Sequence, residues 1–433
     1  MKILIIADEE WNDYVYGNNV LTNWFGGFDA EFAEVYCSPG LPNNHVCESY
    51  FQITDKQMLK SLVSKSKAGG RVYLPQGEEQ VSLSKKNVQR EGIYGLMKKV
   101  STKVHTLVML LRDFIWCHGR YDEKALAAFV GEFNPDIVFC PRYITPKLMR
   151  LEKTVATMTN APFVALTADD EVSLKQVSYS PLYWIRRLWI RKKFKKHVGL
   201  YKHYFTFSKD QAEEYRREYG VNTSVLYKCG DFDYPNKPKP VNNPIRMVYA
   251  GRLYCKRWMT LAKIGEALNL LNKDGVKAVL DIYSQGKLSK KQIRAFSVSD
   301  YISFKGAVCS KELSEIYKKA DIALHVESFE KRYKYATRVS FSTKIIDLMA
   351  STCAIMAVCW DQHAGYQYLK ENDAAFCVSD YDDLLPAIQS FVNDTSQITM
   401  MQERAWQCGM SHHRKSQIHQ QIFNLFNSVI NEH

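Results

Sequence analysis

The sequence predicts an α/β protein with two doubly wound domains in tandem. Two observations predict this fold class: short apolar runs alternate with helical patterns along the chain, and the alternation stops once, at residues 231–244, before it restarts. The length of 433 residues fits two or three domains at about 150 residues each. We therefore expect two parallel sheets, each covered by helices on both faces.

Continuous apolar runs predict the strands of the first half. The run Ile3-Leu4-Ile5-Ile6-Ala7 shows no polar alternation, as expected for a strand buried on both faces. Similar runs lie at 135–140, 163–166 and 204–208, and helical patterns lie at 20–25 and 123–133. This half is predicted to be one α/β domain over residues 1–235.

A proline-rich segment separates the two halves. Residues 231–244 contain four prolines, and proline fits neither a helix interior nor a central strand. Beyond it, strands are predicted at 245–250, 278–283, 302–304, 322–325 and 354–358. A second domain is expected over 244–412, and residues 413–433 are expected to form a terminal amphipathic helix.

The composition indicates a globular protein with ample core, since 46% of the residues are apolar and 24% are charged. A formal net charge of +12 favours acidic partners such as nucleic acid, an anionic membrane or phosphorylated ligands. The eleven cysteines form no Cys-x-x-Cys pair or zinc spacing, which favours buried thiols in a reducing compartment. With no signal sequence and no apolar stretch of membrane-spanning length, we expect a cytoplasmic protein.

The first candidate binding residues follow a predicted strand. Gly251 ends the strand at 245–250 and allows a ligand to approach the backbone. Arg252, Lys256 and Arg257 come directly after it and can neutralise a diphosphate, although a solvated basic turn explains them equally well. Because ligands bind at the carboxyl ends of parallel strands, these residues are in a suitable place.

Two further segments carry candidates for the same chemistry. Ser342 and Thr343 precede a predicted helix as an N-cap pair, so the helix start and the charge of Lys344 suit an anion, while Asp347 can accept hydrogen bonds from ribose. An ordinary capped helix explains this segment as well. Glu327 follows the strand at 322–325 and can meet a sugar hydroxyl, or it can be a surface carboxylate.

Taken in order, these segments resemble the C-terminal domain of glycosyltransferase family 4, the group 1 glycosyl transferases. The matching segments lie at 249–257, 282–286, 302–306, 320–328 and 348–355. Residues 135–138 and 205–230 are similar to that family's N-terminal domain. The resemblance implies the GT-B fold, in which two Rossmann-like domains face a central cleft and the C-terminal helix crosses back to the N-terminal domain.

The resemblance also implies roles for individual residues. Arg252, Lys256 and Lys344 would bind the diphosphate of a nucleotide-sugar donor, and Asp347 would bind its ribose. The family usually has a glutamate at the position of Ser340 and a glycine at that of Thr352, so the sugar-contacting loop departs from the family pattern.

The activity implied is transfer of a glycosyl group from a nucleoside diphosphate, without a cofactor and with retained anomeric configuration. Fixed cations would stabilise the leaving diphosphate in place of a metal. Asp231-Phe232-Asp233 has metal-binding spacing but lies in the predicted linker, so no metal site is expected. The acceptor would be a glycan or a lipid-linked glycan, as in the biosynthesis of surface polysaccharides.

Candidate groups on the acceptor side are two neighbouring carboxylates. Asp169 and Asp170 follow the strand at 163–166, so they are expected at the binding edge of the first domain. One of them can orient or deprotonate an acceptor hydroxyl, and together with Glu327 they are the predicted catalytic residues. Acidic residues are also common in loops without any catalytic role.

The stretch at 182–196 is the most unusual in composition, with seven basic residues, several aromatic ones and no acidic one. It predicts either a contact with an anionic membrane surface or a solvated basic helix packed on its own domain. A helical wheel mixes its apolar and basic positions. With a membrane contact, the protein would be peripheral on the inner face of the cell membrane.

Three other functions remain open from the sequence. A GT-B nucleotide-sugar epimerase and a non-catalytic homologue would share the same fold. A nucleic-acid-binding protein would also fit the net charge of +12, but no groove-tracking basic module or exposed aromatic sheet is recognisable. We therefore expect no nucleic-acid partner.

Overall fold

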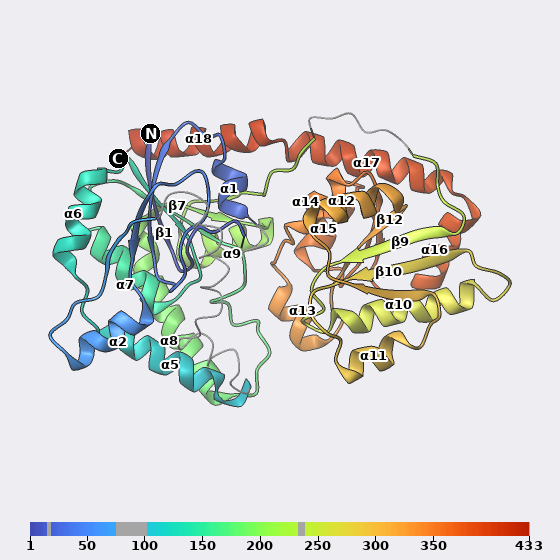
Figure 1. The fold of residues 1–433 in the computed structure, drawn as a ribbon, viewed down its shortest axis with the longest axis horizontal. Helices are drawn as coiled ribbons and strands as arrows, with labels where there is room; N and C mark the ends of the chain where they lie inside the picture. The colour runs from blue at the N-terminus through green and yellow to red at the C-terminus, as the bar shows by residue number, and fades with distance from the viewer. Residues whose placement is uncertain (15–18, 75–101, 233–238, 433) are drawn as a thin grey trace. The chain divides into compact units, whose positions relative to one another are not determined.

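The computed structural model describes residues 1–14, 19–74, 102–232 and 239–432 (Figure 1). The chain divides into two compact units: Met1–Leu226 together with His419–His433, and Tyr227–Ile418. The first boundary falls before the proline-rich segment, part of which lies outside the described residues. From His419 onwards the C-terminal helix belongs to the first unit, so the expected return of this helix is present.

The first unit is built on an eight-stranded sheet in the order β4-β3-β2-β1-β5-β6-β7-β8. All neighbouring strands run parallel except the β3–β4 pair at one edge. The strands are β1 (Lys2–Ala7), β2 (Glu31–Tyr36), β3 (Ser49–Gln52), β4 (Gly70–Val72), β5 (Ile137–Pro141), β6 (Phe163–Thr167), β7 (Tyr201–Thr206) and β8 (Thr223–Val225).

Helices cover both faces of this sheet. They are α1 (Val20–Phe25), α2 (Asp55–Val63), α5 (Thr102–His118), α6 (Glu123–Phe133), α7 (Pro146–Val155), α8 (Pro181–His197), α9 (Lys209–Tyr219) and α18 (Lys415–Asn431), with a short 3₁₀ turn at Val198–Leu200. Apolar side chains of α5, α7 and α8 join one core with the strands. On the other face, Phe139 of β5 packs against Phe25 of α1 and Phe426 of α18.

The second unit is built on a six-stranded parallel sheet in the order β11-β10-β9-β12-β13-β14. The strands are β9 (Ile245–Ala250), β10 (Ala278–Tyr283), β11 (Ile302–Gly306), β12 (Ile322–Val326), β13 (Ala354–Val358) and β14 (Phe376–Val378). Four of them have fully or largely apolar sequences, as strands covered on both faces require.

The helices of the second unit are α10 (Arg257–Leu271), α11 (Lys290–Phe296), α12 (Ser310–Lys319), α13 (Lys331–Thr337), α14 (Lys344–Ala350), α15 (Ala364–Glu371), α16 (Leu384–Asn393) and α17 (Ser396–His412). Figure 1 shows α10 and α11 on one face of the strands and α12, α14 and α17 on the other. Both units are thus doubly wound, as predicted.

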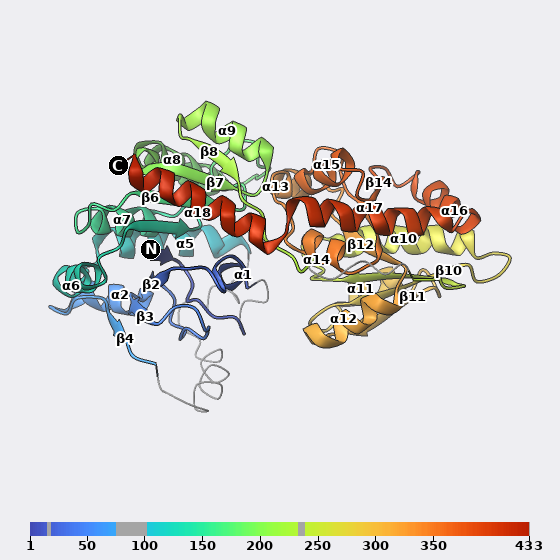
Figure 2. The same cartoon turned by 90° about the horizontal axis from the view of Figure 1, so that it is seen from above.

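Each sheet has one place where the strand order reverses direction. In the first unit it lies between β1 and β5, and in the second between β9 and β12. Loops leaving such neighbouring strands go to opposite faces, so a crevice opens at their carboxyl ends, where ligands of open α/β sheets bind. Figure 1 labels β9 between β10 and β12, and Figure 2 shows β12 from a second direction. A ligand site is therefore expected at one of these two places.

None of the helices in the described ranges combines the length and the apolar character needed to span a lipid bilayer.

Candidate functional site

The crevice of the second unit contains a polar pocket formed by loops that follow β9 and β12 and by the start of α14. Its lining residues are Tyr249, Ala250, Arg257, Leu324, His325, Val326, Glu327, Ser342, Lys344 and Leu348. Four of the residues singled out in the sequence therefore line one pocket, although up to 87 positions separate them in the chain: Arg257, Glu327, Ser342 and Lys344. Their convergence follows from the sheet order, since β9 and β12 are neighbours.

Lys344 links the two loops most directly. Its ammonium donates a hydrogen bond over 3.3 Å to the carbonyl oxygen of Ala250, the last residue of β9. A Cβ atom on Gly251 would lie 2.4 Å from the Lys344 nitrogen and 2.9 Å from the Tyr249 hydroxyl. The glycine predicted to admit a ligand is therefore needed to admit the lysine itself.

The pocket has more positive charge than nearby acceptors can balance. Burial, followed by the charges of Arg257 and Arg252, lowers the pKa of Lys344 to about 8. Arg252 is exposed, and within the described ranges its side chain has no ion pair or hydrogen bond. A half-buried ammonium with one carbonyl acceptor, close to a guanidinium that has no partner among the described residues, is an arrangement that a bound anion would stabilise.

Glu327 and Arg257 are paired with each other. The guanidinium of Arg257 donates to both carboxylate oxygens, over 2.9 Å from Nε to Oε2 and at closer range to Oε1. Burial tends to lower the pKa of Arg257, but the Glu327 carboxylate raises it above its ordinary value. Glu327 is only 3% exposed, so a sugar hydroxyl would have to compete with this pair for its oxygens.

The turn before α10 holds Arg257 in position. Cys255 and Lys256 both adopt left-handed backbone conformations, with φ of 53° and 59°. Such conformations are unfavourable for side chains other than glycine and are often found at functional sites. The Lys256 ammonium forms an ion pair with Glu330. In this structure Lys256 is thus neutralised, whereas Arg252 is not.

The predicted N-cap at the start of α14 is wrong. Thr343 occupies the cap position with helical angles, φ −56° and ψ −22°, and its side chain caps no backbone N–H. A cap residue needs an extended conformation for its oxygen to reach back to the helix. The helix is also only seven residues long, so the anion-binding character of this segment comes from Lys344 rather than from the helix start.

Asp347 forms an ion pair with Lys228 over 2.7 Å, and its side chain is 50% exposed. The carboxylate therefore remains accessible to a further hydrogen-bond donor.

Three buried side chains beside the pocket are of the types that bind metal ions. Ligand atoms of His325, Cys359 and His363 lie within 4.8 Å of one another. However, the Gly365 N–H donates to Nδ1 of His363, which places the proton of the neutral ring on Nε2. Nε2 would have to lose this proton to bind a metal, so the hydrogen bond from Gly365 does not favour one.

Comparison with known families identifies the second unit. Residues 244–394 match the family model for glycosyl transferases group 1. The match spans 151 of the 433 residues, so the likeness to this family is found in the second unit. A comparison with curated protein sequences finds no match for the chain.

Solved structures extend the likeness to the whole fold. Sucrose-phosphate synthase from Thermosynechococcus elongatus superposes with a TM-score of 0.62 at 13% identity, covering 100% of both chains. The E. coli trehalose-6-phosphate protein bound with UDP-2-fluoro glucose gives 0.61 at 10% identity, covering 98% of this chain and 99% of that one. At such identities the likeness establishes the fold, so the predicted GT-B fold class is confirmed.

A mutant of S. aureus TarM, solved with fondaparinux, alpha-GlcNAc-glycerol and UDP, gives a TM-score of 0.52 at 13% identity. The match covers 71% of this chain and 59% of TarM, so this chain spans less than two thirds of that protein.

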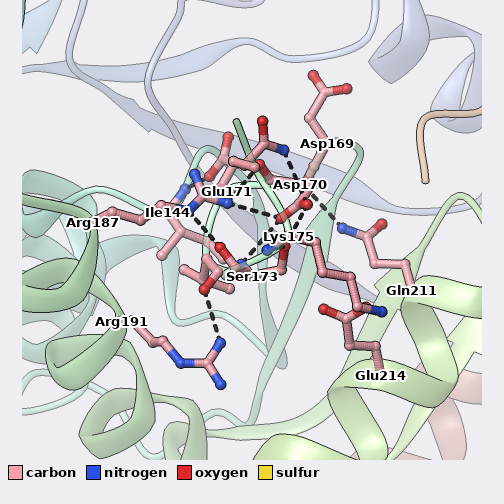
Figure 3. A network of polar contacts seen from close by, with 12 residues as sticks. Ile144, Asp169, Asp170, Glu171, Ser173, Lys175, Arg187, Arg191, Gln211 and Glu214 are labelled. Carbon is pink, nitrogen blue, oxygen red and sulfur yellow. Dashed lines mark hydrogen bonds and ion pairs between the residues drawn. The ribbon is translucent and has the colours of Figure 1, made fainter. Parts of the chain in front are cut away.

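In the first unit, Asp170 is the centre of a polar network (Figure 3). Its carboxylate accepts hydrogen bonds from the Ser173 N–H over 3.1 Å, the Ser173 hydroxyl over 2.5 Å and Gln176 over 3.0 Å. It also forms an ion pair with Arg187 of α8 over 3.0 Å, and both side chains are buried. These contacts fix the loop after β6 to α8 and do not favour the predicted proton-transfer role.

Asp169 is exposed, and its carboxylate points away from that of Asp170 (Figure 3). Its backbone carbonyl accepts a hydrogen bond from Gln211 of α9. The two carboxylates therefore lie in different surroundings. That of Asp170 is held by hydrogen bonds and an ion pair within the first unit, whereas that of Asp169 is exposed.

Glu9 is a candidate that the sequence analysis missed. It follows β1 at the strand-order reversal of the first unit. Burial, and then the charge of Glu10, raises the pKa of Glu9 to about 7, a value suited to a general base near neutral pH. Applying the strand-end argument to the first strand as well would have found it.

Proposed function

We propose that this chain is a glycosyltransferase that takes a sugar from a nucleoside diphosphate sugar held in the second unit. The observation that carries the proposal is the cationic pocket, where Lys344 contacts the end of β9 and the nearby Arg252 has no anionic partner among the described residues. A pyrophosphate supplies the missing negative charge. The family match at residues 244–394 and the UDP and UDP-sugar ligands of the structural neighbours support the nucleotide-sugar class.

The proposed reaction breaks the bond between the anomeric carbon and the diphosphate oxygen and forms a new bond from that carbon to an acceptor hydroxyl oxygen. The diphosphate leaves with the electron pair, so negative charge grows on it as the reaction proceeds. Lys344 and Arg252 stabilise this charge, and loss of one such donor typically costs about 3–4 kcal/mol of barrier. Glu327 holds Arg257 against the same pocket. Asp347 remains the proposed partner of the ribose hydroxyls.

On the acceptor side we propose that Glu9 orients the acceptor hydroxyl and takes up its proton. Its support is its place at the carboxyl end of β1, where ligands of doubly wound sheets bind, together with a pKa near 7.

The acceptor we propose is a glycan or lipid-linked glycan of a surface polysaccharide, with the protein peripheral on the inner face of the cell membrane. We also propose that transfer retains the anomeric configuration and requires no metal. Both proposals derive from the resemblance to glycosyltransferase family 4. The anomeric proton signals of the product, and activity measured with and without EDTA, test them.

A thermal-shift screen against UDP-, GDP- and ADP-sugars tests the donor site. A ligand at 100 times its dissociation constant adds about 2.7 kcal/mol of stability, which is readily detected. Lys344→Ala should abolish the shift. Lys263→Ala is the matched control, since Lys263 is exposed on α10 and forms its ion pair with Glu266 of the same helix. If no nucleotide sugar shifts the wild-type protein, or if Lys344→Ala shifts as much as the wild type, the proposal is wrong.

A further inference from the structure

The packing of α8 separates its basic residues into two sets. Arg186, Arg187 and Arg191 pair with Asp113, Asp170 and Glu218, respectively, within the first unit. The four lysines, at positions 192, 193, 195 and 196, are all exposed and form no ion pair with any described residue. The arginines are thus structural. Among the lysines, Lys193 lies over the ring of Trp189 at 4.6 Å from its centroid, and all four ammonium groups remain without an ion pair among the described residues.

The exposed positions of α8 change character along its axis. Leu182, Ile185 and Leu188 are 46%, 61% and 51% exposed, and they occupy the N-terminal half of the helix. The lysines occupy the C-terminal half. On a helical wheel these exposed apolar and basic positions share one face, so they are separated along the helix axis and not around it.

The neighbouring helix α5 presents a second apolar stripe. Leu107, Leu111 and Phe114 are 58%, 60% and 55% exposed, at the spacing of one helix face. The Arg186–Asp113 ion pair holds α5 against α8, and the exposed Ile185 and Phe114 are the chain neighbours of these two residues. In Figure 1 the two helices lie beside each other in the first unit. Six large apolar side chains are thus exposed on two adjoining helices.

We propose that these six apolar residues and the four lysines, which we name the α5–α8 surface, bind the protein to an anionic lipid bilayer. The apolar groups would enter the boundary between headgroups and acyl chains, and the lysines would contact lipid phosphates. Long lysine stems allow the charge to reach the headgroups beside an inserted apolar group. This inference deepens the proposed function, because a lipid-linked acceptor would be met at that surface.

Apolar exposure by itself would also fit a protein partner. The lysines favour the bilayer, since a cluster of exposed positive charge beside exposed aliphatic groups matches an anionic headgroup layer over an apolar interior.

Flotation with vesicles of phosphatidylcholine, with and without 30% phosphatidylglycerol as probe lipid, tests the proposal on the full chain. We expect binding to the anionic vesicles that weakens as salt rises. Lys192→Glu with Lys196→Glu should reduce binding at least about tenfold. Leu111→Ser with Ile185→Ser should reduce it similarly, and since both residues are exposed the fold should be kept.

Matched controls come from α11 of the second unit, where Lys290→Glu with Lys291→Glu makes the same charge change and Ile293→Ser removes an apolar group that is 54% exposed. These variants should bind vesicles like the wild type.

Three outcomes would overturn the proposal: no binding to anionic vesicles, equal loss in the α11 controls, or a lipid-free dimer that the serine changes dissociate. The last would make the surface a protein interface. The donor-induced thermal shift of each variant separates the membrane proposal from the donor-site proposal. A variant that loses vesicle binding should keep the full thermal shift. Absence of the shift in the wild-type protein would count against the donor site alone.

Discussion

The ammonium of Lys344 and the carbonyl oxygen of Ala250 lie 3.3 Å apart, which joins the first residue of α14 to the last residue of β9. This contact places Lys344 near the guanidinium groups of Arg257 and Arg252. Burial and these two charges lower the pKa of Lys344. Burying a charge beside like charges lowers stability unless a counter-ion is present. The contact is therefore better explained by a ligand than by the fold.

Lys344→Met should stabilise the ligand-free protein while abolishing nucleotide-sugar binding. The pKa of Lys344 lies below its unfolded value, so at neutral pH its charge opposes folding, by on the order of 2–3 kcal/mol. Methionine keeps the stem and removes the charge. Calorimetric unfolding with and without UDP-glucose measures both effects. A lower melting temperature without ligand would show instead that the ammonium supports the fold.

Affinity for UDP-glucose should fall as pH rises above about 8. Binding needs the Lys344 ammonium, which the free protein loses through its pKa of about 8, and the pyrophosphate diester has no proton to lose in this range. Titration calorimetry between pH 6.5 and 8.5 should show constant affinity at the low end and a decline at the high end. Lys344→Arg, which stays charged, should remove the pH dependence.

Gly251→Ala should weaken donor binding by about tenfold, or 1.4 kcal/mol, with the fold retained. The new methyl group would displace the Lys344 nitrogen and crowd the Tyr249 hydroxyl. Equilibrium binding of UDP measures the loss. Gly131→Ala on α6 is the control, because a Cβ there meets no atom within 4 Å. Unchanged affinity in Gly251→Ala would mean that Lys344 does not contact the ligand from this position.

Asp170→Asn should destabilise the protein by about 3 kcal/mol, because it leaves the buried Arg187 without its anionic partner. Asp169→Asn, at the exposed neighbouring position, should change stability by less than about 0.5 kcal/mol. Urea unfolding measures both. If Asp170→Asn kept full stability but lost turnover, the catalytic role predicted for it would return.

Glu9→Gln should lower kcat by at least about a hundredfold and leave the donor-induced thermal shift unchanged. The effect of Glu9 on stability can be distinguished from its effect on the reaction, because only the former appears as a pH dependence of unfolding. The folded pKa of about 7 exceeds the ordinary value of 4.5, so the wild-type protein loses stability as pH rises through this window, and the variant should not. Loss of that pH dependence with normal turnover would leave Glu9 without a role in the reaction.

Much of the site could be predicted residue by residue, but the partner of each residue could not. Arg257 and Glu327 were both identified because each follows a strand, yet nothing in a linear pattern indicates that they bind each other. The same holds for Lys256 with Glu330 and for Asp170 with Arg187. Ion pairs between loops depend on which strands are neighbours, and strand order is a tertiary property.

By itself, the sequence determined the alternation of strands and helices, because buried parallel strands need continuous apolar runs such as 3–7, 245–250 and 354–358. It did not reveal β2, where Glu31 and Glu34 interrupt the apolar pattern although Glu34 is fully buried. Only the tertiary structure decided which charges are neutralised inside the fold and which remain for ligands. Charge balance depends on distances of a few ångströms between loops that the chain order leaves far apart.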